Sequence, residues 1–390
     1  MSDLYLIDPE PSPRWAPFCD SRPISELRAG AWLIRERWEA IAGGETRGIR
    51  GHPSLHGFVE DAVPPVGLLD SIPGPAIVGR SEFAPTGITP TLPNTPARFV
   101  NDGATVGWWV PAESTWEEGD HDEWEPIEFE GLLLHGGYDV VTALEHFLVA
   151  DVADFINEGG DPLPDECVVI GDPVDVILAG AAVEPGVIFD VRQGAVVLEQ
   201  HVYVQAGTRL VGPVYVGPGT EVLGGVIQSS VFGPRCKVRG EIAGSVFLGY
   251  TNKVHDGFIG HSAIGRWVNL GADTVTSDLK NNYGDVRLQL GDATIETHRQ
   301  KLGSLIGDHV KTAIGTLFNT GTIVGTGANV FGVTRPPKYI PPFAWGTEGD
   351  TMSEEGFLTV ASRVMPRRGV ELTDDVRRML EKIYHGATQS

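Results

Sequence analysis

The stretch that decides the fold is residues 198–222, which read LEQHVYVQAGTRLVGPVYVGPGTEV. An aliphatic residue returns at every sixth position of this stretch, at Leu198, Val204, Leu210, Val216 and Val222. A six-residue period fits neither an α-helix, which repeats about every 3.6 residues, nor a single strand, which alternates. It is typical of a β-solenoid, in which each short strand ends at a corner.

The same register returns further along the chain, at Ile264, Leu270, Ile306, Val324 and Val330. We therefore expect a solenoid from about Val168 to about Val333. The register breaks between residues 276 and 304, where polar residues predict a loop that projects from a corner. Such loops on a rigid scaffold often carry function.

The flanking regions have other patterns. Residues 1–165 look α/β, with a short apolar strand at 4–7 and helices predicted over 31–41 and 144–156. After the solenoid, helices are predicted near 353–364 and 373–384, where apolar residues follow helical spacing. The expected parts are therefore an α/β domain at 1–165, a β-helix at 166–346 and a C-terminal helical arm at 347–390.

Composition limits the classes of partner. The net charge is −23, and residues 1–165 carry 29 acidic residues, nine arginines and no lysine. Nucleic-acid binding is not expected without a basic face, and a phosphorylated substrate is expected in the second half. Without a long apolar run or a basic leader, and with three scattered cysteines, we expect a cytoplasmic protein that does not enter a membrane.

The densest group of polar residues on the predicted solenoid lies in residues 240–260, with Glu241, Asn252, Lys253 and His255. A solenoid strand ordinarily offers aliphatic and small residues. Polar groups are costly there unless they face a ligand or one another. Further polar residues follow at 269, 280–283 and 311.

The spacing of these residues resembles the acetyltransferase domain of the bacterial N-acetylglucosamine-1-phosphate uridyltransferase/glucosamine-1-phosphate N-acetyltransferase family. A variant branch of sugar-nucleotidyltransferase-like proteins is more similar still. His255 follows Glu241 by fourteen residues, precedes Ile264-Gly265 by nine and precedes Asn269-Leu-Gly-Ala by fourteen. The family's catalytic His has the same offsets, and the match covers about residues 200–335.

The resemblance implies a left-handed parallel β-helix of hexapeptide repeats, assembled as a homotrimer, with acetyl-CoA bound between subunits. A sugar amine must lose a proton before it attacks a thioester, and imidazole titrates near neutral pH. We therefore predict His255 as general base, with Glu241 fixing its tautomer. The predicted substrate-binding residues, for the sugar, its phosphate or CoA, are Asn252, Lys253, Asn269, Lys280, Asn281, Asn282, Tyr283 and Lys311. The family has Asn where this chain has Asp278, so the acceptor stays open.

A zinc site was also considered, because some hexapeptide solenoids bind zinc through three His residues. His255 and His261 are six residues apart, so they lie on adjacent faces and diverge. By the six-residue period, His309 is expected three coils further along the axis. One zinc ion within a subunit cannot reach all three.

In this family the first domain is a nucleotidyltransferase with a Gly-rich loop that wraps nucleotide phosphates. Here the loop reads DPEPSPR at residues 8–14, so the glycines are absent. Arg14 and Arg22 are candidate nucleotide contacts, and Asp102 is the candidate nucleotide and Mg²⁺ ligand. The domain is interpreted as degenerate, and we expect no efficient nucleotidyl transfer by the usual mechanism.

The sequence therefore predicts a transferase of UDP-N-acetylglucosamine biosynthesis type: an acyl-CoA-dependent N-acyltransferase that acts on a glucosamine-1-phosphate-like amino-sugar phosphate. One alternative is a bifunctional enzyme that also joins UTP to a sugar 1-phosphate with Mg²⁺. Another is a non-catalytic sugar-nucleotide-binding or assembly protein. O-acylation of a sugar hydroxyl also remains open.

Overall fold

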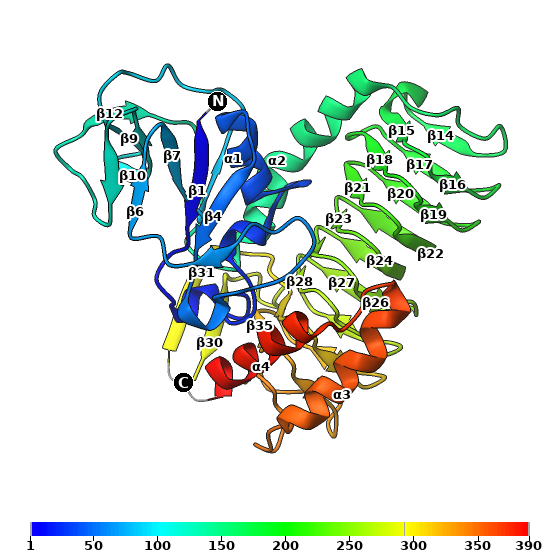
Figure 1. Ribbon diagram of the computed structural model, residues 1–390. Helices are drawn as coiled ribbons and strands as arrows, with labels where there is room; N and C mark the ends of the chain where they lie inside the picture. Colours follow the sequence, from blue (N-terminus) through cyan, green and yellow to red (C-terminus); the bar gives the residue numbers. More distant parts are fainter. Residues whose placement is uncertain (1, 292, 389–390) are drawn as a thin grey trace.

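The computed structural model describes residues 2–291 and 293–388. Figure 1 shows an N-terminal sheet domain, a long β-solenoid beside it and a pair of C-terminal helices packed across the later coils. The predicted order of an α/β domain, a parallel β-helix and a helical tail is confirmed. The coil is consistent with the left-handed β-helix that the resemblance implies.

One face of the solenoid is a nine-stranded parallel sheet. Its strands in order are β15 (Val176–Leu178), β18 (Val196–Leu198), β21 (Val214–Val216), β23 (Val231–Phe232), β25 (Val246–Phe247), β28 (Ala263–Ile264), β32 (Ser304–Ile306), β35 (Thr322–Val324) and β37 (Tyr339–Ile340). Strict register places the last residue of each strand in one column, which is buried from Leu178 to Ile340. This stacking of aliphatic and phenyl groups is the source of the periodicity in the sequence.

The other faces come from an eleven-stranded sheet and a two-stranded pair. Their strands are β14 (Val168–Ile170), β16 (Ala182–Val183), β17 (Ile188–Asp190), β19 (Tyr203–Val204), β20 (Arg209–Val211), β22 (Glu221–Gln228), β24 (Lys237–Ala243), β26 (Asn252–Lys253), β27 (Phe258–Gly260), β29 (Val275–Thr276), β33 (Lys311–Thr312), β34 (Leu317–Phe318) and β36 (Asn329–Val330). All ten predicted anchors are buried, from Leu198 to Val330. The six-residue period is not kept throughout: Val216 stacks on Leu198 eighteen residues earlier, but Phe247 stacks on Phe232 only fifteen earlier.

The insertion between residues 276 and 304 is more than the predicted loop. It contains an antiparallel hairpin of β30 (Val286–Leu290) and β31 (Ala293–Arg299). Val286 and Leu288 are buried, so the hairpin has its own apolar face. Arg299 binds Thr142 and Glu145 of the helix α2 (Asp139–Asp154), at 2.7 Å each, which fixes the hairpin beneath the N-terminal domain (Figure 1).

The N-terminal domain is built on a seven-stranded mixed sheet in the order β12-β9-β10-β7-β1-β4-β5. The strand β1 (Asp3–Ile7) pairs in parallel with β4 (Thr46–Arg50) and β7 (Ala76–Arg80), whereas β10 (Ala104–Val110) runs antiparallel to β7. The remaining members are β5 (Val66–Gly67), β9 (Ala97–Asn101) and β12 (Glu125–Glu128). The first helix, α1 (Ile34–Ala42), buries Trp38 against the sheet. An added Cβ at Gly79 of β7 would come within 2.6 Å of that indole.

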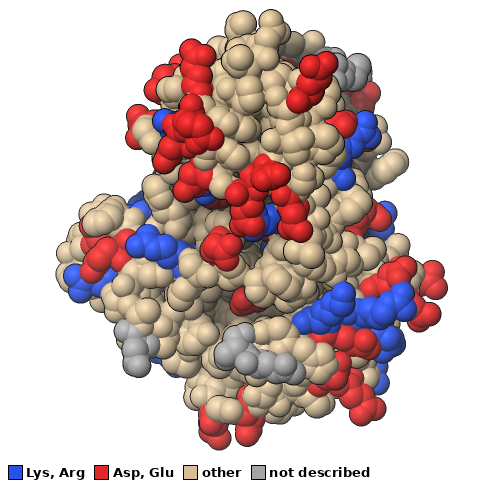
Figure 2. Space-filling view, turned by 60° about the vertical axis from the view of Figure 1, so that its left-hand side comes forward, with Lys and Arg blue, Asp and Glu red and all other residues tan. Residues whose placement is uncertain are grey.

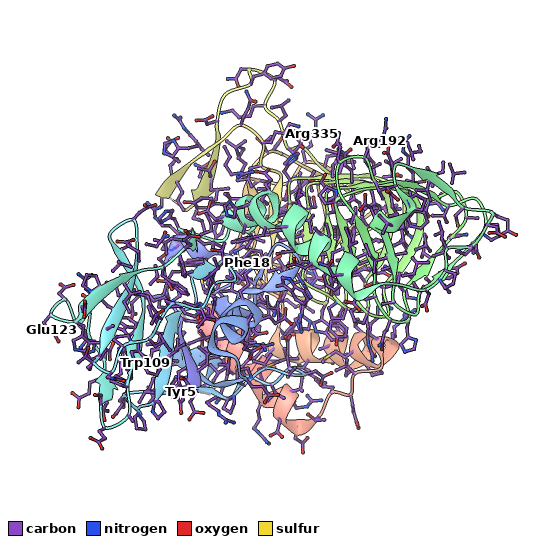
Figure 3. The ribbon with its side chains drawn as sticks, turned by 90° about the horizontal axis from the view of Figure 1, so that it is seen from above. Tyr5, Phe18, Trp109, Glu123, Arg192 and Arg335 are labelled. Atoms are coloured by element: carbon purple, nitrogen blue, oxygen red, sulfur yellow. The ribbon has the colours of Figure 1, made fainter. Side chains whose placement is uncertain are left out.

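Smaller elements complete this domain. Two-stranded pairs are β2 (Arg28–Ala29) with β3 (Trp32–Leu33), β6 (Ser71–Pro73) with β11 (Thr115–Glu117), and β8 (Phe83–Pro85) with β13 (Gly131–Leu133). Single 3₁₀ turns are η1 (Pro13–Trp15), η2 (Ile24–Glu26), η3 (Pro53–Leu55), η4 (Phe155–Glu158) and, at the start of the solenoid, η5 (Pro173–Asp175). Seen from above in Figure 3, Phe18 lies between the sheet, marked by Tyr5, Trp109 and Glu123, and the solenoid, marked by Arg192 and Arg335. In Figure 2 acidic side chains gather over the upper part of the face, in keeping with the acidic first half of the sequence.

The C-terminal arm consists of α3 (Glu354–Val364), the 3₁₀ turn η6 (Met365–Arg368) and α4 (Asp374–Thr388). Its apolar residues Val376, Met379, Leu380 and Ile383 are buried, as their helical spacing predicts. The arm touches the N-terminal domain, where Lys382 donates to the carbonyl of His56 at 2.9 Å. It also touches the solenoid through Arg368 and Asn252, at 3.1 Å. None of the helices among the described residues has the length and apolar character needed to cross a membrane.

Candidate functional site

His255 lies at the corner between β26 and β27, and its side chain is exposed. Glu241, on β24, is also exposed and pairs in register with Phe258, three residues after the histidine. Within residues 2–291 and 293–388, no hydrogen bond joins His255 to Glu241 or to another side chain. The imidazole therefore faces solvent, with both ring nitrogens available to a ligand.

Lys253 lies inside the coil rather than on its surface. It pairs with Val238 of the preceding coil, and the neighbouring bridge of Asn252 to Asn269 aligns it with Leu270 of the next. Its ammonium group donates to the backbone carbonyls of Arg239 (3.0 Å) and His255. Burial lowers the pKa of Lys253 to about 8. The predicted phosphate contact needs correction, because the ammonium group is held by the backbone; it braces the corner that carries His255.

Asn252 and Asn269 occupy one outward-facing column of the solenoid. The amide of Asn252 donates to the side-chain oxygen of Asn269 at 2.9 Å, and Arg368 of the arm donates to Asn252. The two predicted substrate-binding residues are therefore brought together, but in a ladder that the arm partly covers. Lys311 extends this column, and its ammonium group donates to the carbonyls of Trp267 and His309 at 2.8 and 2.9 Å. Burial lowers the pKa of Lys311 to about 7.

The other predicted substrate residues lie on the segment that leads into the hairpin. Asn281, Asn282 and Tyr283 are exposed there, and Tyr283 has 65% of its surface accessible. The Lys280 ammonium donates to the carbonyl of Asp285 at 2.6 Å, which closes the turn. Residues 281–283 are therefore the most solvent-accessible of the predicted substrate-binding residues.

A histidine–carboxylate pair was missed by the sequence reasoning. His261 Nδ1 lies 2.7 Å from Asp278 Oδ2, and both side chains are mostly buried at the base of the insertion. Burial is the largest single influence and would raise the pKa of Asp278. The hydrogen bond and the charge of His261, with smaller contributions from the backbone and Lys301, together lower the pKa. Asp278 was noted as a departure from the family, and its spacing of seventeen residues from His261, about one coil, was the signal that could have paired them.

In the N-terminal domain, Asp102 requires a correction. It lies at the tip of the β9–β10 hairpin, where Asp102 and Gly103 both have positive φ, of 47° and 82°. An Asp-Gly pair with two positive φ values is the preferred two-residue hairpin turn, which explains this sequence without a metal. Within the described ranges no group of three or more His, Cys, Asp or Glu residues could hold a metal ion.

The two arginines predicted to bind nucleotide are far from equivalent. Arg14 is exposed on the turn η1. Arg22 is fully buried, and its guanidinium binds Asp308 of the solenoid at 2.7 Å and Glu60 at 3.1 Å. Arg22 therefore joins the two domains and cannot reach a nucleotide in this arrangement.

The carboxyl ends of β1 and β7 meet where a ligand binds in many open α/β sheets. Asp8 follows β1, and Ser81 and Glu82 follow β7. Asp8 Oδ1, Glu82 Oε2 and the Ser81 hydroxyl are inaccessible to solvent and lack partners within the described ranges. Burial, with a smaller contribution from the neighbouring Glu82, raises the pKa of Asp8 to about 7, although the nearby Ser81 side chain and the backbone N–H of Ile24 partly offset it. This edge presents acidic groups where a nucleotide phosphate would require donors.

Comparison with known proteins supports the class that the repeats indicate. No protein-family model matches the chain. The chain is 36% identical over 86 residues to the bifunctional protein GlmU of Methanococcus maripaludis strain C7, which is 22% of this chain and 21% of that protein. It is 34% identical over 86 residues, 22% of this chain and 21% of that protein, to GlmU of Methanocaldococcus jannaschii.

A third relative has a more descriptive name. The bifunctional sugar-1-phosphate nucleotidylyltransferase/acetyltransferase of Sulfurisphaera tokodaii is 31% identical over 91 residues, which is 23% of each chain. The match thus spans only about a fifth to a quarter of the length of these relatives. Over that stretch the predicted resemblance to the GlmU-type proteins is confirmed.

Proposed function

We propose that the protein is an acyl-CoA-dependent N-acyltransferase that acts on a glucosamine-1-phosphate-like amino-sugar phosphate. The observation that supports this most is the exposed imidazole of His255 at a solenoid corner, which has no side-chain partner among the described residues, in a chain similar to a protein named as a nucleotidylyltransferase/acetyltransferase. The working form is proposed to be a cytoplasmic homotrimer, with substrate and acetyl-CoA in grooves between its copies.

In the proposed reaction, the neutral sugar amine attacks the thioester carbonyl while His255 accepts the amine proton. The new C–N bond forms and the C–S bond breaks, and the proton passes to the departing thiolate, so the products are the amide and free CoA. A general base of this kind typically contributes about 10²–10⁴-fold to the rate. Glu241 is proposed to accept the other ring N–H once substrate has ordered the imidazole.

The residues that hold the acceptor are proposed to differ from those of the family. Lys253 is directed inward, so it is left out of the phosphate site. Asn281, Asn282 and Tyr283 are exposed next to the insertion and Lys280 is partly exposed there. These four residues are proposed to bind the phosphate or CoA. The Asn252–Asn269 ladder offers amide groups for a sugar hydroxyl.

The second candidate is a bifunctional enzyme that also transfers a nucleotidyl group from UTP with Mg²⁺. The similarity to the bifunctional sugar-1-phosphate nucleotidylyltransferase/acetyltransferase of Sulfurisphaera tokodaii favours it. The acidic edge at Asp8 and Glu82 disfavours it, because this edge presents carboxyl groups where a polyphosphate requires cationic groups or N–H donors. We therefore propose acyl transfer as the main activity.

Release of free CoA thiol from acetyl-CoA and glucosamine-1-phosphate tests the proposal. His255→Asn should lower the rate about 10²–10⁴-fold, since the substitution removes the base but keeps a polar side chain. His201→Asn is the matched control, because His201 is another exposed histidine at a solenoid corner, and it should leave the rate unchanged. Equal rates for the two variants would rule out His255 as the base.

A second assay separates the alternatives. Pyrophosphate release from UTP and N-acetylglucosamine-1-phosphate with Mg²⁺ should be absent if acyl transfer is the main activity. Pyrophosphate release would instead favour the bifunctional enzyme. Failure of both reactions, with glucosamine as well as its phosphate as acceptor, would favour a non-catalytic binding protein.

A further inference from the structure

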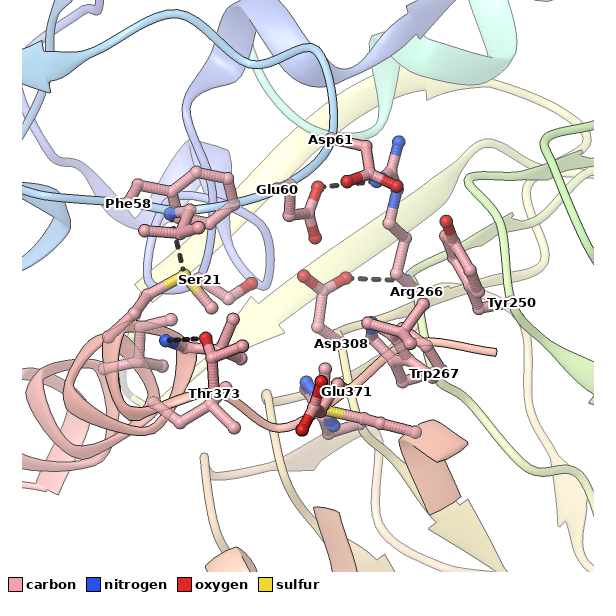
Figure 4. Close-up of a pocket in the computed structure, with 18 of the residues that line it drawn as sticks. Ser21, Phe58, Glu60, Asp61, Tyr250, Arg266, Trp267, Asp308, Glu371 and Thr373 are labelled. Atoms are coloured by element: carbon pink, nitrogen blue, oxygen red, sulfur yellow. Dashed lines mark hydrogen bonds and ion pairs between the residues drawn. The ribbon is translucent and has the colours of Figure 1, made fainter. Parts of the chain in front are cut away.

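A cavity of 320 Å³ lies where the three parts of the molecule meet, and none of the predicted catalytic or substrate-binding residues lines it. Its walls come from residues 58–61 of the N-terminal domain, solenoid residues around 250, 266–267 and 308–309, and arm residues 365–383 (Figure 4). The volume is at the lower end of the range for small-molecule sites.

The inner wall of the cavity is a balanced ion network. Arg266 binds Glu60 at 2.6 Å, and Arg22, behind the wall, binds Glu60 and Asp308. Asp308 also accepts the backbone N–H of Arg266 at 2.7 Å. Two carboxylates and two guanidinium groups therefore neutralise each other. Arg266 is 8% exposed, and its Nε is buried without a partner in the described part of the chain.

A second wall is aromatic. Tyr250 and Trp267 stack with ring centroids 4.3 Å apart, and His309 lies 6.2 Å from Trp267 in a near-parallel orientation. Burial, and then the charge of Lys311, lower the pKa of His309 to about 3, so this ring is neutral. Opposite them α4 presents apolar side chains, including Met379 and Leu380. Trp267 stands between Tyr250 and His309, and the Arg266 guanidinium lies over the Tyr250 ring at 5.7 Å, so a ligand reaches the edges of these rings. The apolar side chains of α4 give the surface against which a flat apolar group can pack.

The remaining charge of the lining is negative. Asp61 and Glu371 are exposed, and among the described residues neither carboxylate has a hydrogen bond or an ion pair. Figure 4 shows them on opposite sides of the cavity, one from the N-terminal domain and one from the arm. Burial raises the pKa of Tyr250, and the nearby Asp61 adds to the shift, which places that carboxylate close to the aromatic wall. Such a lining favours a cation and disfavours anions such as sugar phosphates and acyl-CoA.

We propose that this cavity binds a small organic amine, with its flat apolar body against Tyr250 and Trp267 and its ammonium group between Asp61 and Glu371. The bound amine contacts the N-terminal domain, the solenoid and the arm together. Its binding therefore stabilises the junction of the three parts. This site does not depend on the proposed acyl transfer.

The test uses three probes with the same indole body and different charge: tryptamine, tryptophol and indole-3-propionate. Isothermal titration calorimetry on the full chain should show tryptamine binding about tenfold tighter than tryptophol, with indole-3-propionate weakest. The preference for tryptamine should decrease as salt is raised. Absence of tryptamine binding, or equal affinity for the three probes, would overturn the proposal.

Two variants locate the binding. The double variant Asp61→Asn, Glu371→Gln should bring tryptamine to the affinity of tryptophol. The indole ring of the probe still packs in the cavity, but the two carboxylate charges that attract its ammonium group are gone. Val59→Trp, at a lining position that is 40% exposed, should block all three probes. Val149→Trp, on the 54%-exposed face of α2 and away from the lining, is the matched control and should bind as the parent does. Unchanged tryptamine binding by the Val59 variant would show that the amine binds elsewhere and would overturn the proposal.

Discussion

The solenoid and the N-terminal sheet treat buried charge in opposite ways. In the solenoid, Lys253 takes a position in a mostly aliphatic column, and its ammonium group is bound by two backbone carbonyls. At the edge of the sheet, Asp8 and Glu82 each keep one carboxylate oxygen with no partner among the described residues. The Lys253 ammonium group is hydrogen-bonded by the backbone of the solenoid, whereas the Asp8 and Glu82 carboxyl groups need a proton or a ligand to offset their burial.

This difference indicates which substitutions at buried positions each region can accommodate. A parallel solenoid exposes the same backbone groups at every coil, so a long side chain can replace an aliphatic one if it reaches the carbonyls of a corner. A sheet edge offers no such repeated acceptors or donors. The Asp8 and Glu82 carboxyl groups lie where an open α/β sheet binds its ligand. If a ligand site of this domain has been lost or altered, the change is expected at this edge.

The largest expected effect on the free energy of unfolding comes from breaking the ion pairs of Arg22, which join the N-terminal domain to the solenoid. Arg22→Met removes the guanidinium that binds both Glu60 and Asp308, leaving two buried carboxylates with fewer donors. Breaking a buried ion pair from one side costs about 3–5 kcal/mol, and denaturant unfolding should show that loss. Arg47→Met is the control, because its pair with Asp3 is exposed and should cost less than about 1 kcal/mol. Equal costs would mean that the junction contributes no more than a surface pair.

The next effect concerns the sheet edge. The pKa of Asp8 is raised by burial from 3.8 to about 7, so between these values the folded form keeps a proton that the unfolded chain has lost. Asp8 therefore makes stability fall as pH rises from about 4 to about 7, by up to about 1.4 kcal/mol per pH unit. Asp8→Asn removes this dependence. Unfolding free energies of parent and variant, measured across this range, should diverge in favour of the variant, and parallel curves would contradict the assignment.

The smallest effect concerns the solenoid lysine and has the opposite sign. Burial lowers the pKa of Lys253 from 10.5 to about 8, so between these values the unfolded chain binds the extra proton. Lys253 should make stability rise with pH over this window, with the same upper limit per pH unit over a shorter span. Comparison with Lys253→Met isolates this contribution from that of other lysines and tyrosines. A difference between parent and variant that stays constant from pH 8 to 10.5 would show that the ammonium is not desolvated.

Much of the solenoid could be predicted because its signal is local. Leu198, Val216 and Ile264 lie where a fixed period puts them, and each is buried. The helices also followed their periodicity, although α2 begins at Asp139, five residues before the predicted start. The sequence contains no comparable periodic pattern that would predict contacts between segments far apart in the chain.

Most of the features that were missed depend on contacts between residues that are distant in the sequence, and one was a local turn. Arg22 and Asp308 are 286 residues apart, so no pattern could show that this arginine is bound to the solenoid. Lys253 is predicted from the sequence as a substrate-binding residue, and only the stacking register places it in the interior. Asp102 was interpreted as a metal ligand, although Asp-Gly between two strands is itself a turn signal. The roles of His255 and Glu241 stay predictions.

The contacts of the arm also set an order of events during synthesis. The backbone N–H of Val59 donates to the sulfur of Met379, 320 residues later in the chain. A ribosome must therefore complete every coil of the solenoid before the N-terminal domain receives its last support. Until then Val59 and the N-terminal wall of the cavity between the three parts of the molecule stay exposed to water. The N-terminal sheet of the nascent chain is stabilised during this time by its own aromatic core around Trp38.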